Sequence, residues 1–156
     1  KLFDAVHASP PCQAFTRARF LQGNEHPELI EPTRIALQTL GKPYVIENVI
    51  GAPLNKPIML CGAMFGLRTY RHRLFECSFP IEAPPHPAHV AKTTKMGRRV
   101  ADNEFMHVVG NFVGAEQGRQ IMGMPWATRN ELSEAIPPVY TEFVGKRLIA
   151  QLDLSR

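Results

Sequence analysis

The sequence has few cysteines and no long apolar run. Three cysteines, Cys12, Cys61 and Cys77, are an odd and small number, which argues against a disulfide framework and predicts a reducing, cytoplasmic location. No stretch of about 18 apolar residues occurs, so no segment is expected to span a membrane. The start lacks the apolar core of a signal peptide. There is no Gly-X-Y period, and an apolar content of 44% excludes a disordered chain.

Proline, by contrast, is abundant. The 156 residues include 14 prolines, about twice the usual share of ~5%, so many forced turns are expected. The length favours one globular domain. The formal net charge of +4 indicates a mild preference for polyanionic partners.

The apolar patterning favours an α/β fold. A short apolar run at residues 3–8 ends at two prolines and predicts a buried strand that leads into a loop. Helical spacing predicts a helix over residues 32–40 and a C-terminal helix from Pro138. Further strands are expected at 44–50, 57–61 and 74–79, and an irregular insert at 80–100.

Cys12 follows the first predicted strand, at the strand end where open α/β sheets bind ligands. This place suits a nucleophile, and Arg17 and Arg19 would lower the pKa of its thiol. The alternative is a small buried hydrophobic residue, which is our interpretation of Cys61 and Cys77.

Glu47 interrupts the apolar run of the second strand. Burying a carboxylate is costly unless it is paired or protonated. A raised pKa would make Glu47 a carboxylic acid at neutral pH, able to donate a proton or a hydrogen bond. Alternatively, Glu47 stands at the strand end and caps a neighbouring helix.

Several segments in one order resemble the DNA cytosine-5 methyltransferases. The Pro-Pro-Cys-Gln of residues 10–13 is followed 35 residues later by Glu-Asn-Val. Thr69-Tyr70-Arg71-His72-Arg73 resembles the family's Gln-x-Arg-x-Arg motif, with threonine in place of glutamine. Residues 119–125 and 135–138 are similar to its ninth and tenth motifs. The ordered set spans nearly the whole chain.

The resemblance implies a partial Rossmann-like methyltransferase sheet and chemistry on a cytosine flipped out of double-stranded DNA. Cys12 would attack C6 of the base, and Glu47 would hold or protonate N3. Arg71 would contact O2, while Arg73 would orient the active-site loop or a phosphate. S-adenosylmethionine would supply the methyl group. The resemblance further implies that Asn48 fixes the cysteine loop and that Gln13 and Arg17 contact the substrate.

The resemblance divides the chain into a catalytic part (1–79), a target-recognition insert (80–118) and C-terminal motifs (119–156). The insert carries a basic run without acidic residues, for which phosphate contact and a solvated loop are both open. Base edges would be contacted by side chains near it. His86 and His89 lack a matching Cys or His pair, so no zinc site is expected. The residues of the run are Lys92, Lys95, Arg98 and Arg99, and the candidate base readers are Thr93, Thr94, Asn103 and His107.

The glycine-rich cofactor turn that opens the family's sequences is missing. Of the cofactor positions only Pro11 and Ala135 carry over, while Glu134 stands where the family has asparagine. We therefore expect a fragment, a split subunit or a remnant, inactive alone, whose open sheet edge is covered by a complementary N-terminal half or by a second copy. The alternatives are a non-catalytic DNA-binding subunit and an RNA cytosine methyltransferase.

Overall fold

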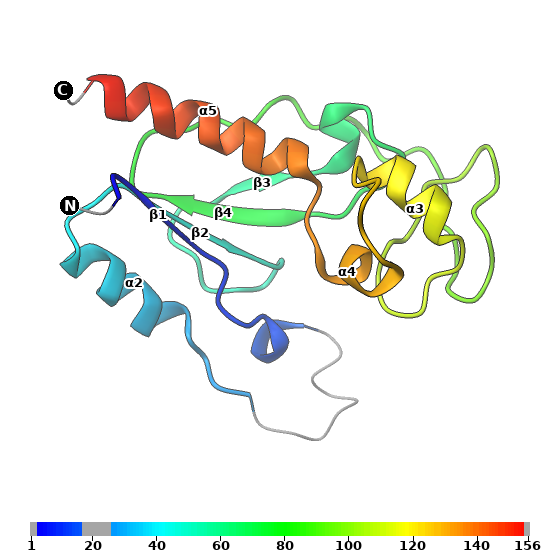
Figure 1. Cartoon of the computed structure of the whole chain (residues 1–156), viewed down its shortest axis with the longest axis horizontal. Helices are drawn as coiled ribbons and strands as arrows, with labels where there is room; N and C mark the ends of the chain where they lie inside the picture. Colours follow the sequence, from blue (N-terminus) through cyan, green and yellow to red (C-terminus); the bar gives the residue numbers. More distant parts are fainter. Residues whose placement is uncertain (1–2, 17–25, 155–156) are drawn as a thin grey trace. The chain divides into compact units, whose positions relative to one another are not determined.

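The computed structural model describes residues 3–16 and 26–154. These residues form a mixed α/β structure, as predicted, with a four-stranded sheet and four α-helices, of which two were predicted (Figure 1). Each predicted strand and helix is present, with most strands shorter than expected: β1 is Val6–Ala8, β2 is Tyr44–Asn48, β3 is Ile58–Leu60 and β4 is Arg73–Cys77. Helix α2 is Ile30–Thr39 and α5 is Pro138–Leu154.

The sheet has the strand order β1-β2-β4-β3 and is mixed. β1 and β2 pair in parallel, with Ala8 opposite Ile46. β2 and β4 pair antiparallel, with Glu47 opposite Phe75. The expectation of a parallel sheet is therefore correct for the β1–β2 pair and wrong for β4, which runs antiparallel to β2.

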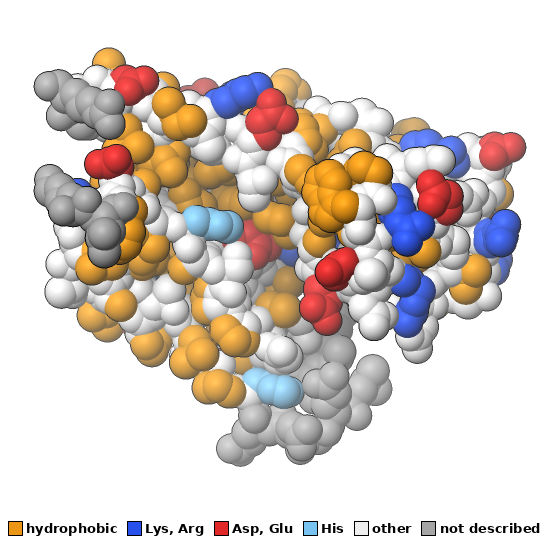
Figure 2. Space-filling view, in the orientation of Figure 1, with side chains coloured by type: hydrophobic (Ala, Val, Ile, Leu, Met, Phe, Trp, Pro, Cys, Tyr) orange, Lys and Arg blue, Asp and Glu red, His pale blue; other side chains and the backbone are white. Residues whose placement is uncertain are grey.

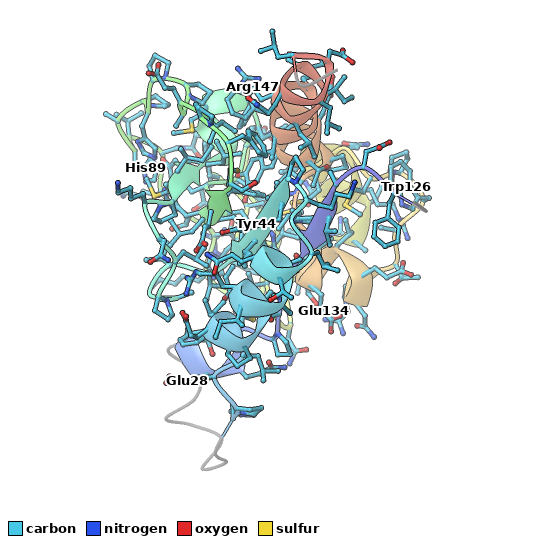
Figure 3. The ribbon with its side chains drawn as sticks, turned by 90° about the vertical axis from the view of Figure 1, so that its left-hand side faces the viewer. Glu28, Tyr44, His89, Trp126, Glu134 and Arg147 are labelled. Carbon is cyan, nitrogen blue, oxygen red and sulfur yellow. The ribbon has the colours of Figure 1, made fainter. Side chains whose placement is uncertain are left out.

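Helix α2 packs on one face of this sheet. Side chains alternate between the two faces of a strand, so Tyr44 and Ile46 of β2 share a face. They form a core with Ile30 and Leu37 of α2, and Figure 3 shows Tyr44 on β2 beside this helix. Glu47 lies on the opposite face of β2 from this core.

The chain forms two compact units. Unit 1 comprises residues 1–59, 73–82 and 146–156, and unit 2 comprises 60–72 and 83–145. This division differs from the three consecutive parts suggested by the motifs, because residues 60–72 group with the insert and the end of α5 groups with the strands. Strand β3 and helix α5 each contribute residues to both units.

Unit 2 contains little regular structure before its helices. In residues 83–114 the backbone is irregular apart from an isolated bridge between Thr93 and Phe105, which confirms the expected irregular insert. Helices α3 (Ala115–Met122) and α4 (Arg129–Glu134) follow, and two short 3₁₀-helices, η1 (Gln13–Phe15) and η2 (Gly62–Phe65), lie earlier in the chain. Within the described residues, no helix combines the length and apolarity needed to cross a bilayer. The core of this unit consists of Val100, Met106, Val108, Phe112, Met122, Ala127 and Leu132.

Candidate functional site

One edge of the sheet in unit 1 brings together segments that are distant in sequence. Because β1 and β2 are parallel, their carboxyl ends lie at the same edge (Figure 1). The loop with Cys12 follows β1, and Glu47 and Asn48 end β2. Because β4 is antiparallel to β2, its first residue, Arg73, also lies at this edge. The sheet topology alone therefore gathers a thiol, a carboxylate, an amide and a guanidinium.

Glu47 is buried and paired. It is 8% exposed, and its Oε1 lies 3.1 Å from Nε of Arg73. A buried carboxylate needs either a charged partner or a proton, and Glu47 has a charged partner. That partner is a residue of strand β4, so Glu47 does not cap a helix in this contact. His7 of β1 is a neighbouring titratable group: desolvation lowers its pKa, against the opposite effect of the Glu47 charge.

Asn48 ties the cysteine loop to the end of β2. Its side chain is 2% exposed; Nδ2 donates to the carbonyl of Pro10 at 2.8 Å, and Oδ1 accepts from the N–H of Val49 at 2.9 Å. This is the backbone contact expected of Asn48. Both halves of the buried amide are satisfied, which fixes the loop two residues before Cys12.

Cys12 is partly buried at the start of η1, where its carbonyl accepts from the N–H of Phe15 at 2.9 Å. The side chain of Gln13 is exposed next to it. The single turn of η1 therefore fixes the backbone of Cys12. Arg17 and Arg19, expected to act on the Cys12 thiol, lie outside the described residues.

Arg71 belongs to unit 2 and is held inside it. The residue is 8% exposed and has a φ of 30°, a left-handed conformation that is strained for a residue with a Cβ. Its guanidinium donates to the carbonyls of Ala135 at 2.6 Å, Ser133 at 2.9 Å and Val108. Tyr140 donates its hydroxyl to the Arg71 carbonyl at 3.0 Å. These contacts favour a structural role for Arg71 and do not support the predicted contact with a base.

The basic run in the insert faces solvent. All four of its cationic side chains are exposed, and Figure 2 shows Lys and Arg gathered over the region of α3 and the insert loops, with acidic side chains among them. Glu104 pairs with Arg98 through two contacts, one of them 2.8 Å long, so one of the four charges is compensated. Thr94 is buried and donates to the carbonyl of Phe105 at 3.1 Å, which argues against its predicted contact with a base edge.

The two residues carried over for the cofactor lie in different units. Pro11 is exposed in unit 1, and Ala135 ends α4 in unit 2. Neither side chain has a polar atom, and the Ala135 carbonyl already accepts from Arg71. These two positions therefore offer no polar side chain to an adenosyl or methionyl group.

The other two cysteines have different surroundings. Desolvation by burial, with a contribution from the Glu76 charge, raises the pKa of Cys77 to about 12, which makes it a poor nucleophile. Cys61 is fully buried in unit 2, and its Sγ lies 3.4 Å from Nε2 of His89. The expectation that His86 and His89 lack a matching pair is wrong: Cys61 and His72 supply it, and no local spacing in the sequence indicates this.

The predicted residues thus fall into two groups. Glu47, Asn48, Arg73 and the Cys12 loop share one sheet edge in unit 1, whereas Arg71 and Ala135 contact each other in unit 2. No protein-family model, curated protein or solved structure matches this chain.

Proposed function

We propose that this chain carries the base-modifying half of a DNA cytosine-5 methyltransferase, on a partial Rossmann-like sheet. The observation that carries the proposal is the buried Glu47–Arg73 pair, 3.1 Å apart, at the sheet edge that also holds the Cys12 loop. A surface ion pair would need no function, but this pair is buried, and the strand end that carries it is tied through Asn48 to the loop of a cysteine whose motif resembles the family's nucleophile motif.

In the proposed reaction, Sγ of Cys12 attacks C6 of a flipped cytosine as a thiolate and forms a C–S bond. The electron pair of the C5–C6 double bond then becomes available at C5. Glu47 contacts N3 and the exocyclic amine, where it stabilises the enamine-like intermediate. After C5 has gained the methyl group, a water molecule takes the C5 proton as a base; the electron pair of that C–H bond restores the C5–C6 double bond, and the C–S bond breaks to release the Cys12 thiolate.

Arg73 takes the role that the motif alone suggests for Arg71. Its Nε is 3.1 Å from one carboxylate oxygen of Glu47. This contact fixes the carboxylate before a base binds and leaves the second oxygen to contact the base. A cation at this position also suits the negative charge that develops on O2 during the attack. Arg71, bound to three carbonyls, supports the backbone of unit 2 instead.

S-adenosylmethionine is the methyl donor in the family that the motifs resemble. Pro11 and Ala135 do not by themselves fit the polar groups of this cofactor. The proposal therefore concerns the steps on the base, and its test needs a substrate that reports them without a methyl donor.

The test is covalent trapping on duplex DNA that contains 5-azacytosine. The ring nitrogen at position 5 makes C6 more electrophilic, so attack by Cys12 leaves an adduct without methyl transfer. We expect a denaturation-resistant adduct with the wild-type chain and with Cys77→Ser, the matched cysteine control. The adduct should disappear in Cys12→Ser. Glu47→Gln should slow its formation by about 10²-fold or more, the usual contribution of a positioned acid–base group.

Absence of an adduct with the wild-type chain would overturn the proposal and favour a non-catalytic DNA-binding role. An adduct that persists in Cys12→Ser would also overturn it, because another nucleophile would be at work. A parallel reaction on 5-azacytosine in structured RNA distinguishes the substrates: faster trapping on RNA than on duplex DNA would contradict the proposed DNA substrate.

A further inference from the structure

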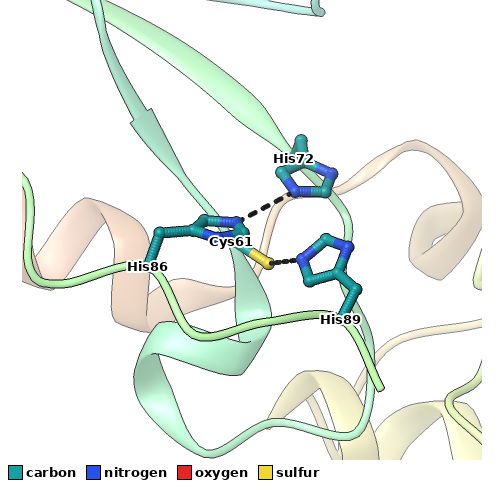
Figure 4. Close-up of side chains that lie close together, drawn as sticks. All are labelled: Cys61, His72, His86 and His89. Carbon is teal, nitrogen blue, oxygen red and sulfur yellow. Dashed lines mark hydrogen bonds between the residues drawn. The ribbon is translucent and has the colours of Figure 1, made fainter. Parts of the chain in front are cut away.

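Four side chains in unit 2 converge from three segments of the chain. Cys61 precedes η2, His72 precedes β4, and His86 and His89 lie in the insert loop. One donor atom from each lies within 4.8 Å of all the others. Figure 4 shows the four side chains pointing toward one another, with Cys61 Sγ 3.4 Å from His89 Nε2 and His72 Nε2 3.3 Å from His86 Nε2.

From this geometry we propose that Cys61, His72, His86 and His89 form a tetrahedral zinc site. With Zn–N distances of about 2.0–2.1 Å and a Zn–S distance of about 2.3 Å, neighbouring ligand atoms of a tetrahedral site lie about 3.3–3.6 Å apart. Both short separations agree with this. The side chains of His86 and His89 are exposed and can rotate to close the longer ones.

A hydrogen-bonded cluster explains less of the arrangement than a metal does. Two hydrogen bonds would join Cys61 to His89 and His72 to His86, but neither bond requires the two pairs to converge. All four donors nevertheless meet, and the rings of His86 and His89 lie 4.8 Å apart. One sulfur and three imidazole nitrogens are a donor set suited to Zn²⁺.

The backbone around the site holds the ligands in place. The N–H of Met64 donates to the carbonyl of Cys61 at 3.0 Å, and the N–H of Cys61 meets Sδ of Met64 at 3.3 Å, so the backbone that carries the Cys61 thiol is fixed. The ring of Tyr70 stacks on His89 with 3.6 Å between centroids, and its hydroxyl donates to the carbonyl of Ala91 at 2.9 Å. The site is therefore supported from η2 and from the insert loop.

Rigid neighbours also limit the position of His86. It stands between Pro85 and Pro87, which restrict the backbone to extended conformations. A backbone hydrogen bond joins the segments that carry Cys61 and His72. The N–H of Gly62, the residue after Cys61, donates to the carbonyl of Tyr70, two residues before His72, at 2.8 Å. Four protein ligands leave no open coordination position, so the site is structural rather than catalytic.

The expected effect of zinc is to fasten the insert. Residues 83–114 contain no helix and only one isolated bridge, so few backbone hydrogen bonds hold them. Zinc would join the start of this segment, at His86 and His89, to Cys61 and His72. In small units with little regular structure, a bound metal commonly supplies the missing stability. This inference does not depend on the proposed methyltransferase activity.

The test is metal titration of the full chain after chelation under reducing conditions, with Co²⁺ as the spectroscopic probe and Zn²⁺ as competitor. We expect one Co²⁺ per chain, visible bands of tetrahedral cobalt and a thiolate-to-cobalt charge-transfer band, all removed by one equivalent of Zn²⁺. Cys61→Ser should abolish the charge-transfer band. His86→Ala should weaken zinc binding at least about tenfold, since even loss of an outer-shell partner costs that much.

Matched controls lie outside the cluster. Cys77→Ser and His107→Ala each remove a residue of the same type, and both should bind metal like the wild-type chain. His86 is exposed, so its substitution tests the site even if Cys61→Ser fails to fold. The proposal is wrong if the wild-type chain binds no Co²⁺, if the bound cobalt is octahedral, or if His86→Ala binds zinc as tightly as the wild type.

Discussion

Replacing Glu76 by glutamine tests the most buried ion pair described in unit 1. Glu76 is 3% exposed and Arg34 is 4% exposed. Nε and Nη2 of Arg34 each donate to a different carboxylate oxygen at 2.8 Å, and the N–H of Asn55 donates at 2.8 Å. Glutamine keeps the shape but removes the charge, and it turns an N–H₂ group toward these donors.

The expected cost is about 3 kcal/mol. Breaking a buried pair by removing one partner costs about 3–5 kcal/mol, because the other charge remains buried. The value falls at the lower end because Arg34 keeps the carbonyl of Pro53, at 2.9 Å, and Glu31. Domains unfold with about 5–15 kcal/mol in total, so the loss is large enough to measure.

Urea unfolding followed by far-ultraviolet circular dichroism measures the free energy of unfolding, and amide hydrogen exchange in β2 and β4 reports unit 1 directly. Glu116→Gln is the matched control, because Glu116 pairs with Arg119 at 2.9 Å with its side chain 72% exposed. That change should cost no more than about 0.5 kcal/mol. A Glu76→Gln loss as small as that of the control would refute the reasoning.

Two further predictions concern the pH dependence of stability and the effect of adding a Cβ atom at two glycines. Burial raises the pKa of Glu76, but hydrogen bonds from Arg34 and its other partners lower it more. The ionised Glu76 therefore stabilises the folded chain above the unfolded-state pKa of about 4.3, and this stabilisation is lost as the pH falls through the lower folded-state pKa. Urea midpoints between about pH 5 and 3 should fall less steeply in Glu76→Gln than in wild type. A Cβ at Gly62 would lie 2.1 Å from the carbonyl oxygen of Thr69, so Gly62→Ala should lower the free energy of unfolding by about 2 kcal/mol or more. Gly145→Ala meets nothing within 4 Å inside α5 and should instead stabilise by about 0.5–1 kcal/mol; equal effects of the two substitutions in thermal unfolding would contradict this argument.

The strands and helices predicted from the sequence are those in which apolar patterning and residue propensity favour the same structure. The strand at β2 is an apolar run of β-branched residues, and the C-terminal helix begins at a proline that suits a first turn. Helix α3 was not predicted, because Gly118 in its middle disfavours a helix. Its packing requires glycine: a Cβ there would lie 3.1 Å from Phe112 and 3.3 Å from Leu132.

Helix α4 had a signal in the sequence. Thr128 accepts from the N–H of Glu131, and the carboxylate of Glu131 accepts in return from the N–H of Thr128. This Thr-x-x-Glu capping box precedes a short helix and indicates a helix start. It would have placed α4 correctly.

The candidate site depends on the pairing of strands β2 and β4, which local sequence patterns do not show. The sequence shows that Glu47 needs a partner or a proton, but Arg73 becomes the partner because β2 and β4 are antiparallel and Glu47 lies opposite Phe75. For the same reason local patterns do not show that Arg73, and not Arg71, pairs with Glu47. The left-handed backbone of Arg71 and its three carbonyl contacts arise from the packing of unit 2.

The two units use different means of stabilisation, and this leads to a last prediction. Unit 1 has a sheet, a helix packed on it and the Arg34–Glu76 pair, whereas residues 83–114 of unit 2 would depend on the proposed zinc site. Chelation should therefore increase amide exchange in residues 83–114 much more than in β2 and β4, and Glu76→Gln should do the reverse. Because α5 contributes to both units, complete unfolding can still be cooperative. Equal exchange changes in both units under both perturbations would show that the two sources of stability are not separate.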